Sequence, residues 1–163
     1  GPSFLTNSML QKTKSTSARN SGGRFAIVAS RYNARYVNSM VRAATAELRS
    51  AGASQIQVIR VPGAFEIPVV AARLARQEKP GWDAVICLGV IIRGETAHAD
   101  LIGRGVTDAL VRLQVETGVP MIHEVLLLKN RDQAKVRCLD PAHNRGREAA
   151  AAALQMKAVI KAL

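Results

Sequence analysis

The sequence predicts a doubly wound α/β sandwich with a four-stranded parallel sheet and helices on both faces. From Arg24 onward, short apolar runs of strand length alternate with segments whose apolar residues recur at helical spacing. The run Ala84–Val90 carries no charged or polar side chain, which is typical of a parallel strand covered on both faces. Because such alternation requires right-handed crossovers, we expect functional groups at the carboxyl ends of the strands.

The first strand is expected at Phe25–Ala29 and the second at Gln55–Val61. Between them, one helix places its apolar residues on one face and ends at Gly52; these residues are Val37, Val41, Ala44 and Leu48. After the second strand, Pro62-Gly63 turns the chain into a helix that carries Ile67, Val70 or Ala71, and Leu74. Pro68 is compatible with that helix only in its first turn.

The third strand, Ala84–Val90, precedes a long helix that ends at Gly118 and has one apolar side, formed by Ile102, Val106, Leu110 and Leu113. A fourth strand is expected at Val119–Leu128, followed by a short helix over residues 131–138. The last helix is rich in alanine, and Asn144 is its expected N-cap.

The length of 163 residues fits one compact domain, expected at 24–163. Residues 1–23 read as a disordered tail that includes a cloning remnant before a start at Met9. No apolar run approaches the roughly 20 residues of a membrane-spanning helix. The opening also lacks the apolar core of a secretory signal, so we expect a cytoplasmic protein without a membrane partner.

The net charge of +11 raises the question of an anionic partner. Residues 1–24 contribute four of these charges, and the rest are spread along the chain with few aromatic residues among them. This pattern does not favour nucleic-acid binding beyond non-specific contact through the basic tail. The two cysteines, Cys87 and Cys138, form neither a CxxC motif nor a zinc knuckle, so we expect reduced thiols and no metal site.

Three segments follow the first three strands, and they carry most of the residues with chemical potential: Ser30–Asn33, Val61–Glu66 and Gly89–His98. The turn Arg93–Thr96 opens a helix, where free N–H groups and the helix dipole favour an anion such as phosphate. A plain strand-to-helix turn is the alternative. His98 beside it is either structural or a proton-transfer group, and Arg137 is either a solvated charge or an anion ligand.

Five motifs occur in order along the chain: Tyr32-Asn33, Pro62–Pro68, Gly89–His98, Gln133–Arg137 and Asn144–Gly146. Together they resemble the lumazine synthase (6,7-dimethyl-8-ribityllumazine synthase) family from about Arg24 onward. The resemblance implies a flavodoxin-like fold and a transferase that condenses 5-amino-6-(D-ribitylamino)uracil with 3,4-dihydroxy-2-butanone 4-phosphate, the penultimate step of riboflavin biosynthesis. Both reacting groups come with the substrates, so no metal or cofactor is expected.

The resemblance also implies roles for individual residues. His98 transfers protons, the Arg137 guanidinium grips the phosphate, and the backbone at Glu95 and Thr96 holds that phosphate. Tyr32 and Phe65 place rings on the pyrimidine, and Glu66 binds the ribityl hydroxyls. Further pocket residues are Asn33, Gly63, Ala64, Val90, Ile91, Ile92, His123 and Arg145.

In the resembled family, Arg137 and His123 complete the site that contains His98 of the next subunit. The implied assembly is a pentamer or a sixty-subunit icosahedral capsid, with riboflavin synthase as a candidate partner. Three segments depart from the family pattern: His123-Glu124 replaces an aromatic-Gly pair, Ala99–Leu101 lacks the usual aromatics, and Arg145 replaces Lys. The alternatives are a non-enzymatic or engineered shell protein on the same scaffold, and a flavin carrier.

Overall fold

The computed structural model describes residues 22–163, so most of the predicted tail, including the proposed cloning remnant and start at Met9, lies outside the described residues. Its centre is a four-stranded, all-parallel sheet with strand order β2-β1-β3-β4. The strands are β1 (Arg24–Ser30), β2 (Gln55–Val61), β3 (Ala84–Ile92) and β4 (Met121–Leu128). The chain therefore confirms the predicted doubly wound fold.

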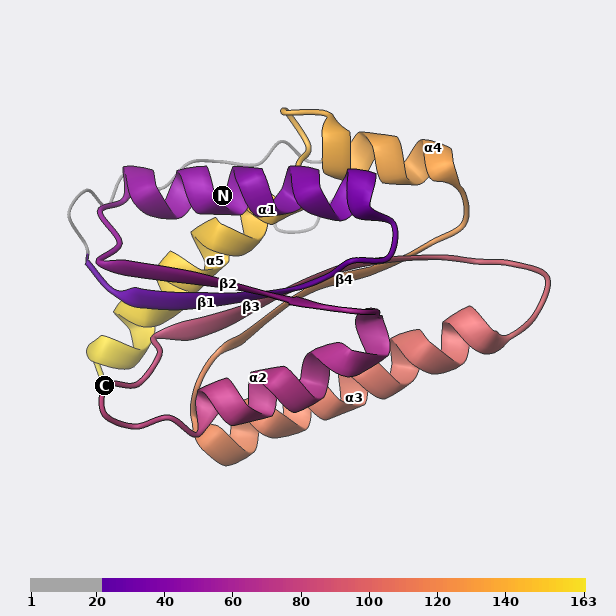
Figure 1. The fold of residues 1–163 in the computed structure, drawn as a ribbon. Helices are drawn as coiled ribbons and strands as arrows, with labels where there is room; N and C mark the ends of the chain where they lie inside the picture. Colours follow the sequence, from indigo (N-terminus) through magenta and orange to yellow (C-terminus); the bar gives the residue numbers. More distant parts are fainter. Residues whose placement is uncertain (1–21) are drawn as a thin grey trace, which may run out of the picture.

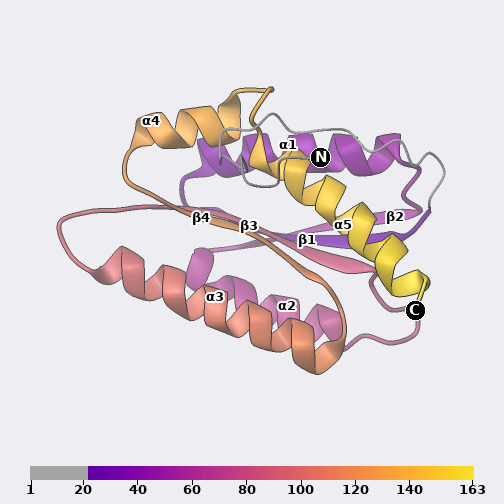
Figure 2. The ribbon, with the colours of Figure 1, turned by 180° about the vertical axis from the view of Figure 1, so that it is seen from behind.

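Helices cover both faces of this sheet (Figures 1 and 2). On one face lie α1 (Ala34–Ser50), α4 (Arg131–Ala134), the π-helical turn η3 (Lys135–Leu139) and α5 (Arg145–Lys161). On the other face lie the 3-10 turn η2 (Ala64–Glu66), α2 (Ile67–Ala75) and α3 (His98–Thr117). Two apolar cores result, because alternate residues of each strand point to opposite faces.

The central strands show this alternation most clearly. Phe25 and Ile27 of β1 belong to the core under α1 and α5, whereas Ala26 and Val28 belong to the core under α2 and α3. In β3 the first seven residues are all buried, as its apolar sequence predicted. The outer strand β2 instead exposes Gln55, Gln57 and Val58.

The predicted helix boundaries rest on local chemistry that the structure confirms. Pro68 lies in the first turn of α2, where its missing N–H costs nothing. Gly118 ends α3 with a φ of 71°, a left-handed conformation that favours glycine. The Asn144 side chain caps α5 by accepting hydrogen bonds from the N–H groups of Gly146 and Arg147.

Several predicted bounds differ from the structure: β1 is one residue longer at each end than predicted, and β3 continues to Ile92. The fourth strand begins at Met121 instead of Val119, because the Val119 N–H is bound to the Thr117 hydroxyl in the preceding turn. The helix expected over residues 131–138 divides into α4 and η3. In η3 the Asp140 N–H bonds to the Lys135 carbonyl five residues earlier, and Pro141 then prevents continuation.

The strand order places a topological switch between β1 and β3, since the chain leaves β1 toward β2 and later returns to the other side of β1. Crevices outside the carboxyl ends of strands at such a switch are the usual ligand sites of doubly wound folds. No helix within residues 22–163 is long and apolar enough to cross a membrane.

Candidate active site

The loops after β1, β2 and β3 meet at the carboxyl edge of the sheet. The Arg31 N–H donates to the Val61 carbonyl at 2.8 Å, and the Tyr32 N–H donates to the Pro62 carbonyl at 3.2 Å. The Asn33 side-chain amide donates to the Val90 carbonyl at 2.7 Å. The first predicted loop is therefore tied to the end of β2 and to β3 at the switch point.

Asn33 fixes the conformation of the first loop. Its backbone has φ 58° and ψ 43°, in the left-handed region that asparagine tolerates better than most residues. Its side-chain amide is already engaged by Val90, so Asn33 acts in the free chain as a tie between the β1–α1 loop and β3. A direct contact of Asn33 with substrate stays a prediction.

Two aromatic rings stand in solvent on adjoining loops. Tyr32 is 74% exposed and Phe65 is 65% exposed. Phe65 lies against α3 near Gly105, where an added Cβ would be 3.8 Å from the ring. Exposed rings next to a crevice can stack on a planar ligand, and this is the role that sequence reasoning gave them.

Glu66 follows Phe65 and is half-buried, and its Oε1 lies 3.0 Å from the point where a Gly63 Cβ would stand. Any side chain at Gly63 would therefore press on the Glu66 carboxylate. Val90 is buried, and Ile91 and Ile92 are half-buried at the end of β3. The end of β3 therefore offers apolar side chains, and the Glu66 carboxylate offers hydrogen-bond acceptors.

The β3–α3 loop brings His98 to the first position of α3. Its backbone N–H donates to the Thr96 hydroxyl at 3.3 Å, and the His98 side chain is exposed. The N-terminus of this 20-residue helix carries a partial positive charge, which favours an anion beside Glu95 and Thr96. Arg93 adds a cation, partly neutralised by Asp100 at 2.9 Å.

The other predicted site residues come from different parts of the molecule. Arg137 lies in η3 and Arg145 begins α5, both on the face of the sheet opposite α3 (Figure 1). Within residues 22–163 no hydrogen bond or ion pair joins His98 to Arg137. One copy of the chain therefore presents them as separate groups.

The environments of the two arginines differ. The Arg137 Nε is buried and finds no hydrogen-bond acceptor among the described residues. Arg145 is only 9% exposed, and its Nη1 donates to Glu148 at 2.7 Å. The unbonded Nε gives Arg137 donor capacity for an anion, and Arg145 already directs its Nη1 to Glu148.

His123 lies in the middle of β4, in register with Cys87. It is five residues before the strand end, about 16 Å from the loops at 3.3 Å per residue. Its Nδ1 accepts from the Val125 N–H at 3.0 Å, so Nε2 carries the proton and donates to the Thr107 hydroxyl at 2.8 Å. Burial lowers the pKa of His123, which favours this neutral ring.

Sequence reasoning did not assign a role to Glu124, although an acidic residue inside an apolar strand was a visible signal. Burial raises the pKa of its carboxyl to about 7, with Arg145 acting in the opposite direction and Glu148 in the same direction. Glu124 and Arg137 also act on the same neighbour, because both influence the pKa of the Cys138 thiol. This titratable group therefore belongs to the arginine-bearing side of the chain.

No group of three histidine, cysteine or acidic side chains in the described part of the chain could hold a metal ion. Both cysteines are buried and free. The residues at the strand ends thus offer rings, one imidazole, a carboxylate and a helix N-terminus.

The fold and these loops define a doubly wound α/β protein whose switch point carries exposed aromatic rings, while an exposed histidine opens the helix that follows β3. A sequence model of the 6,7-dimethyl-8-ribityllumazine synthase family matches residues 22–161, and the chain belongs to this family. The family is one of transferases, so the chain is an enzyme.

Curated relatives carry the same name. The 6,7-dimethyl-8-ribityllumazine synthase of Desulfotalea psychrophila is 40% identical over 87% of this chain and 92% of its own length. That of Salinibacter ruber is 39% identical over 87% and 91%, respectively. That of Kineococcus radiotolerans is 42% identical over 83% of each chain.

Proposed function

We propose that this chain condenses 5-amino-6-(D-ribitylamino)uracil with 3,4-dihydroxy-2-butanone 4-phosphate to 6,7-dimethyl-8-ribityllumazine, releasing phosphate and water, at sites shared between neighbouring copies. The observation that carries the proposal is that exposed Tyr32, Phe65 and His98 all lie in segments that follow the carboxyl ends of β1, β2 and β3. In a chain of the lumazine synthase family, that edge supplies the pyrimidine shelf and the proton-transfer group.

Each site residue has a separate role in this reaction. Tyr32 and Phe65 hold the pyrimidine, Glu66 accepts hydrogen bonds from the ribityl hydroxyls, and the backbone at Glu95 and Thr96 binds the phosphate. The amine and the ketone both belong to the substrates, so the protein supplies juxtaposition, which contributes roughly 7 to 11 kcal/mol in favourable cases. His98 moves the proton that leaves the attacking amine and the proton needed when water departs, worth about 10² to 10⁴-fold.

Arg137 of an adjoining copy completes the phosphate grip. Its Nε is buried and finds no acceptor among residues 22–163, which supports a role toward a ligand or a neighbour. We also assign His123 and Arg145 to the contributed residues, although they lie on opposite faces of the sheet, where His123 contacts Thr107 of α3 and Arg145 contacts Glu148 of α5.

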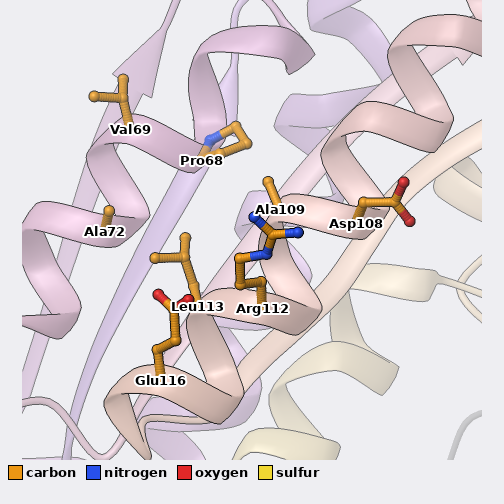
Figure 3. A pocket seen from close by; sticks show the side chains of 8 residues that line it. All are labelled: Pro68, Val69, Ala72, Asp108, Ala109, Arg112, Leu113 and Glu116. Carbon is orange, nitrogen blue, oxygen red and sulfur yellow. The ribbon is translucent and has the colours of Figure 1, made fainter.

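An apolar groove supports assembly. It has a volume of about 420 Å³ and lies between α2 and α3 (Figure 3). Its floor and rim consist of Pro68, Val69, Ala72, Asp108, Ala109, Arg112, Leu113 and Glu116. On α3, Val111 is 54% exposed and Val115 is 79% exposed. We propose that neighbouring copies cover this surface in a pentamer, alone or within a sixty-subunit icosahedral capsid.

The cellular setting belongs to the same proposal. The substrates are small and water-soluble, and two buried thiols suit a reducing compartment, so we place the enzyme in the cytoplasm with riboflavin synthase as the enzyme that uses its product.

The test mixes both substrates with the protein and follows the absorbance of the lumazine product. We expect His98→Ala and Arg137→Ala each to lower the rate by at least tenfold. Arg49→Ala, which removes an exposed arginine in the last turn of α1, is the matched control and should keep the wild-type rate. A wild-type rate no faster than the uncatalysed mixture would favour the shell-protein alternative.

A further inference from the structure

A row of arginines runs along the outer side of α1. Arg35, Arg42 and Arg49 are seven residues apart and all are exposed. At 1.5 Å per residue, their Cα atoms are about 10 Å apart and the row is about 20 Å long. The buried residues of α1, including Val37, Met40 and Ala44, occupy the opposite side of the helix, so the arginines form its outermost ridge.

No acidic residue accompanies this ridge. The one acid of α1 is Glu47, which is buried on the inner side. None of the three arginines forms an ion pair with another residue of the described chain. An ordinary solvated helix surface mixes both signs of charge, so an unbroken basic ridge indicates an anionic partner.

The positive charge continues beyond the N-terminal end of the helix. Arg31 is exposed in the β1–α1 loop, and Arg60 of β2 lies nearby. Burial lowers the Arg60 pKa, and the positive charge of Arg31 lowers it further. One Arg60 guanidinium nitrogen, Nη1, is buried without a hydrogen-bond acceptor in residues 22–163. The positive charge of the α1 row thus extends through Arg31 and Arg60, and none of these arginines forms an ion pair within residues 22–163.

We propose that the basic row of α1 (Arg35, Arg42 and Arg49) docks the sugar-phosphate backbone of double-helical nucleic acid without regard to base sequence. Its arginine spacing equals about three base-pair steps of 3.4 Å, so the row covers about six steps of a duplex. The side chains that flank the row, Asn38 and Thr45, are too short to read base edges beyond the arginines.

The same surface fits other anionic partners poorly. A membrane-surface helix needs an apolar side to insert among lipids, but the apolar side of α1 is buried in the core. The α3 helix of a second copy offers no acidic row, because its acids alternate with Arg104 and Arg112. Nucleic acid would be a partner in addition to the small-molecule substrates, and its binding to α1 does not depend on the enzyme site.

The test measures binding of the full chain to two fluorescent 20-base-pair DNA duplexes of unrelated sequence, by anisotropy over a range of salt concentrations. We expect similar affinity for both duplexes. The triple variant R35Q/R42Q/R49Q should bind at least tenfold more weakly, and its plot of log K against log salt should be shallower by about 2 to 3. The charge-retaining variant R35K/R42K/R49K should stay close to wild type.

The matched control is R73Q/R76Q/R104Q, which removes the same charge from exposed positions on the opposite helical layer. It should lose much less affinity than the α1 variant. Circular dichroism confirms that each variant is folded. Equal losses in the two Gln triples would assign binding to net charge alone, and wild-type binding to vesicles with 30% phosphatidylserine but not to DNA would assign the row to lipid. Either result, or no binding of DNA by wild type, overturns the proposal.

Discussion

Asn33 holds the first site loop through its backbone and its side chain together. Its φ of 58° is costly for residues with a bulky Cβ, and its amide donates to Val90 at 2.7 Å. Position 33 therefore needs both a residue that tolerates the left-handed region and a donor of this length.

Replacing Asn33 separates these two requirements. Asn33→Ala loses the hydrogen bond and strains the backbone, so the free energy of unfolding should fall by about 2 kcal/mol. Asn33→Gly relieves the strain but still lacks the donor, so it should lose only about 1 kcal/mol. Urea unfolding measures both. Equal losses in the two variants would show that the backbone conformation contributes nothing.

Glu124 makes stability depend on pH in a predictable direction. Burial raises its pKa from 4.5 to about 7 in the folded chain, so between these values the folded state holds a proton that the unfolded state has released. Stability must then decrease as pH rises from about 4.5 to 7, by on the order of 3 kcal/mol.

Glu124→Gln removes this titration while keeping the shape of the side chain. As pH rises from about 4.5 to 7, the free energy of unfolding of wild type should fall relative to that of the variant. Denaturant unfolding at several pH values measures this difference. Parallel pH profiles for the two proteins would mean that the Glu124 carboxyl is not perturbed by its surroundings.

At the scale of elements, the packing of α5 on α1 depends on Gly146. A Cβ on Gly146 would overlap the Met40 backbone carbonyl, and a backbone group cannot rotate away as a side chain can. The same glycine lies in the first turn of α5, two residues after the Asn144 cap and next to Arg145. The close approach of the two helices thus also sets where the arginine-bearing surface lies.

Gly146→Ala should lower the free energy of unfolding by roughly 3 kcal/mol. Gly105→Ala is the matched control, because Gly105 lies within α3 and an added Cβ would meet only Phe65 at an ordinary 3.8 Å. That control should be neutral or stabilising by up to about 1 kcal/mol. Thermal and urea unfolding distinguish the two, and a Gly146 variant as stable as the Gly105 variant contradicts the packing argument.

The elements show what a sequence can predict in this fold. The bounds of β2 and the cap at Asn144 follow from local patterns, and the structure confirms them. The π-helical turn at Lys135–Leu139 was not predicted: the Asp140 N–H bonds to the Lys135 carbonyl, and Asn144 binds the Cys138 carbonyl at 2.8 Å. Helical periodicity of the apolar residues does not distinguish such a turn from an ordinary α-helical one.

The candidate site likewise has features that follow from the sequence and features that depend on tertiary contacts. The convergence of three loops follows from parallel strands, whose carboxyl ends share one edge of the sheet. The tie from Asn33 to Val90 and the raised pKa of Glu124 depend on tertiary neighbours, so the sequence alone could not reveal them. The seven-residue spacing of the α1 arginines is visible in the sequence. The buried residues of α1 were needed to show that these arginines lie on its outer side.

At the scale of the whole molecule, the sheet separates the two halves of the proposed site. The rings and His98 lie with the loops and α3, whereas Arg137 and Arg145 lie with η3 and α5 on the other face. The groove between α2 and α3 gives neighbouring copies a surface to cover (Figure 3). A head-to-tail ring of identical copies would bring one half of each site to the other half.

Complementation between two inactive variants tests this shared site most directly. His98→Ala and Arg137→Ala are denatured, mixed in equal amounts and refolded together, and lumazine formation is measured against each variant refolded alone. If neighbouring copies share each site, random assembly places intact His98 beside intact Arg137 in roughly a quarter of the sites, and activity returns to about that fraction of wild type. Mixed assemblies that form but stay as inactive as the separate variants would show that one chain supplies both groups, which contradicts the shared site.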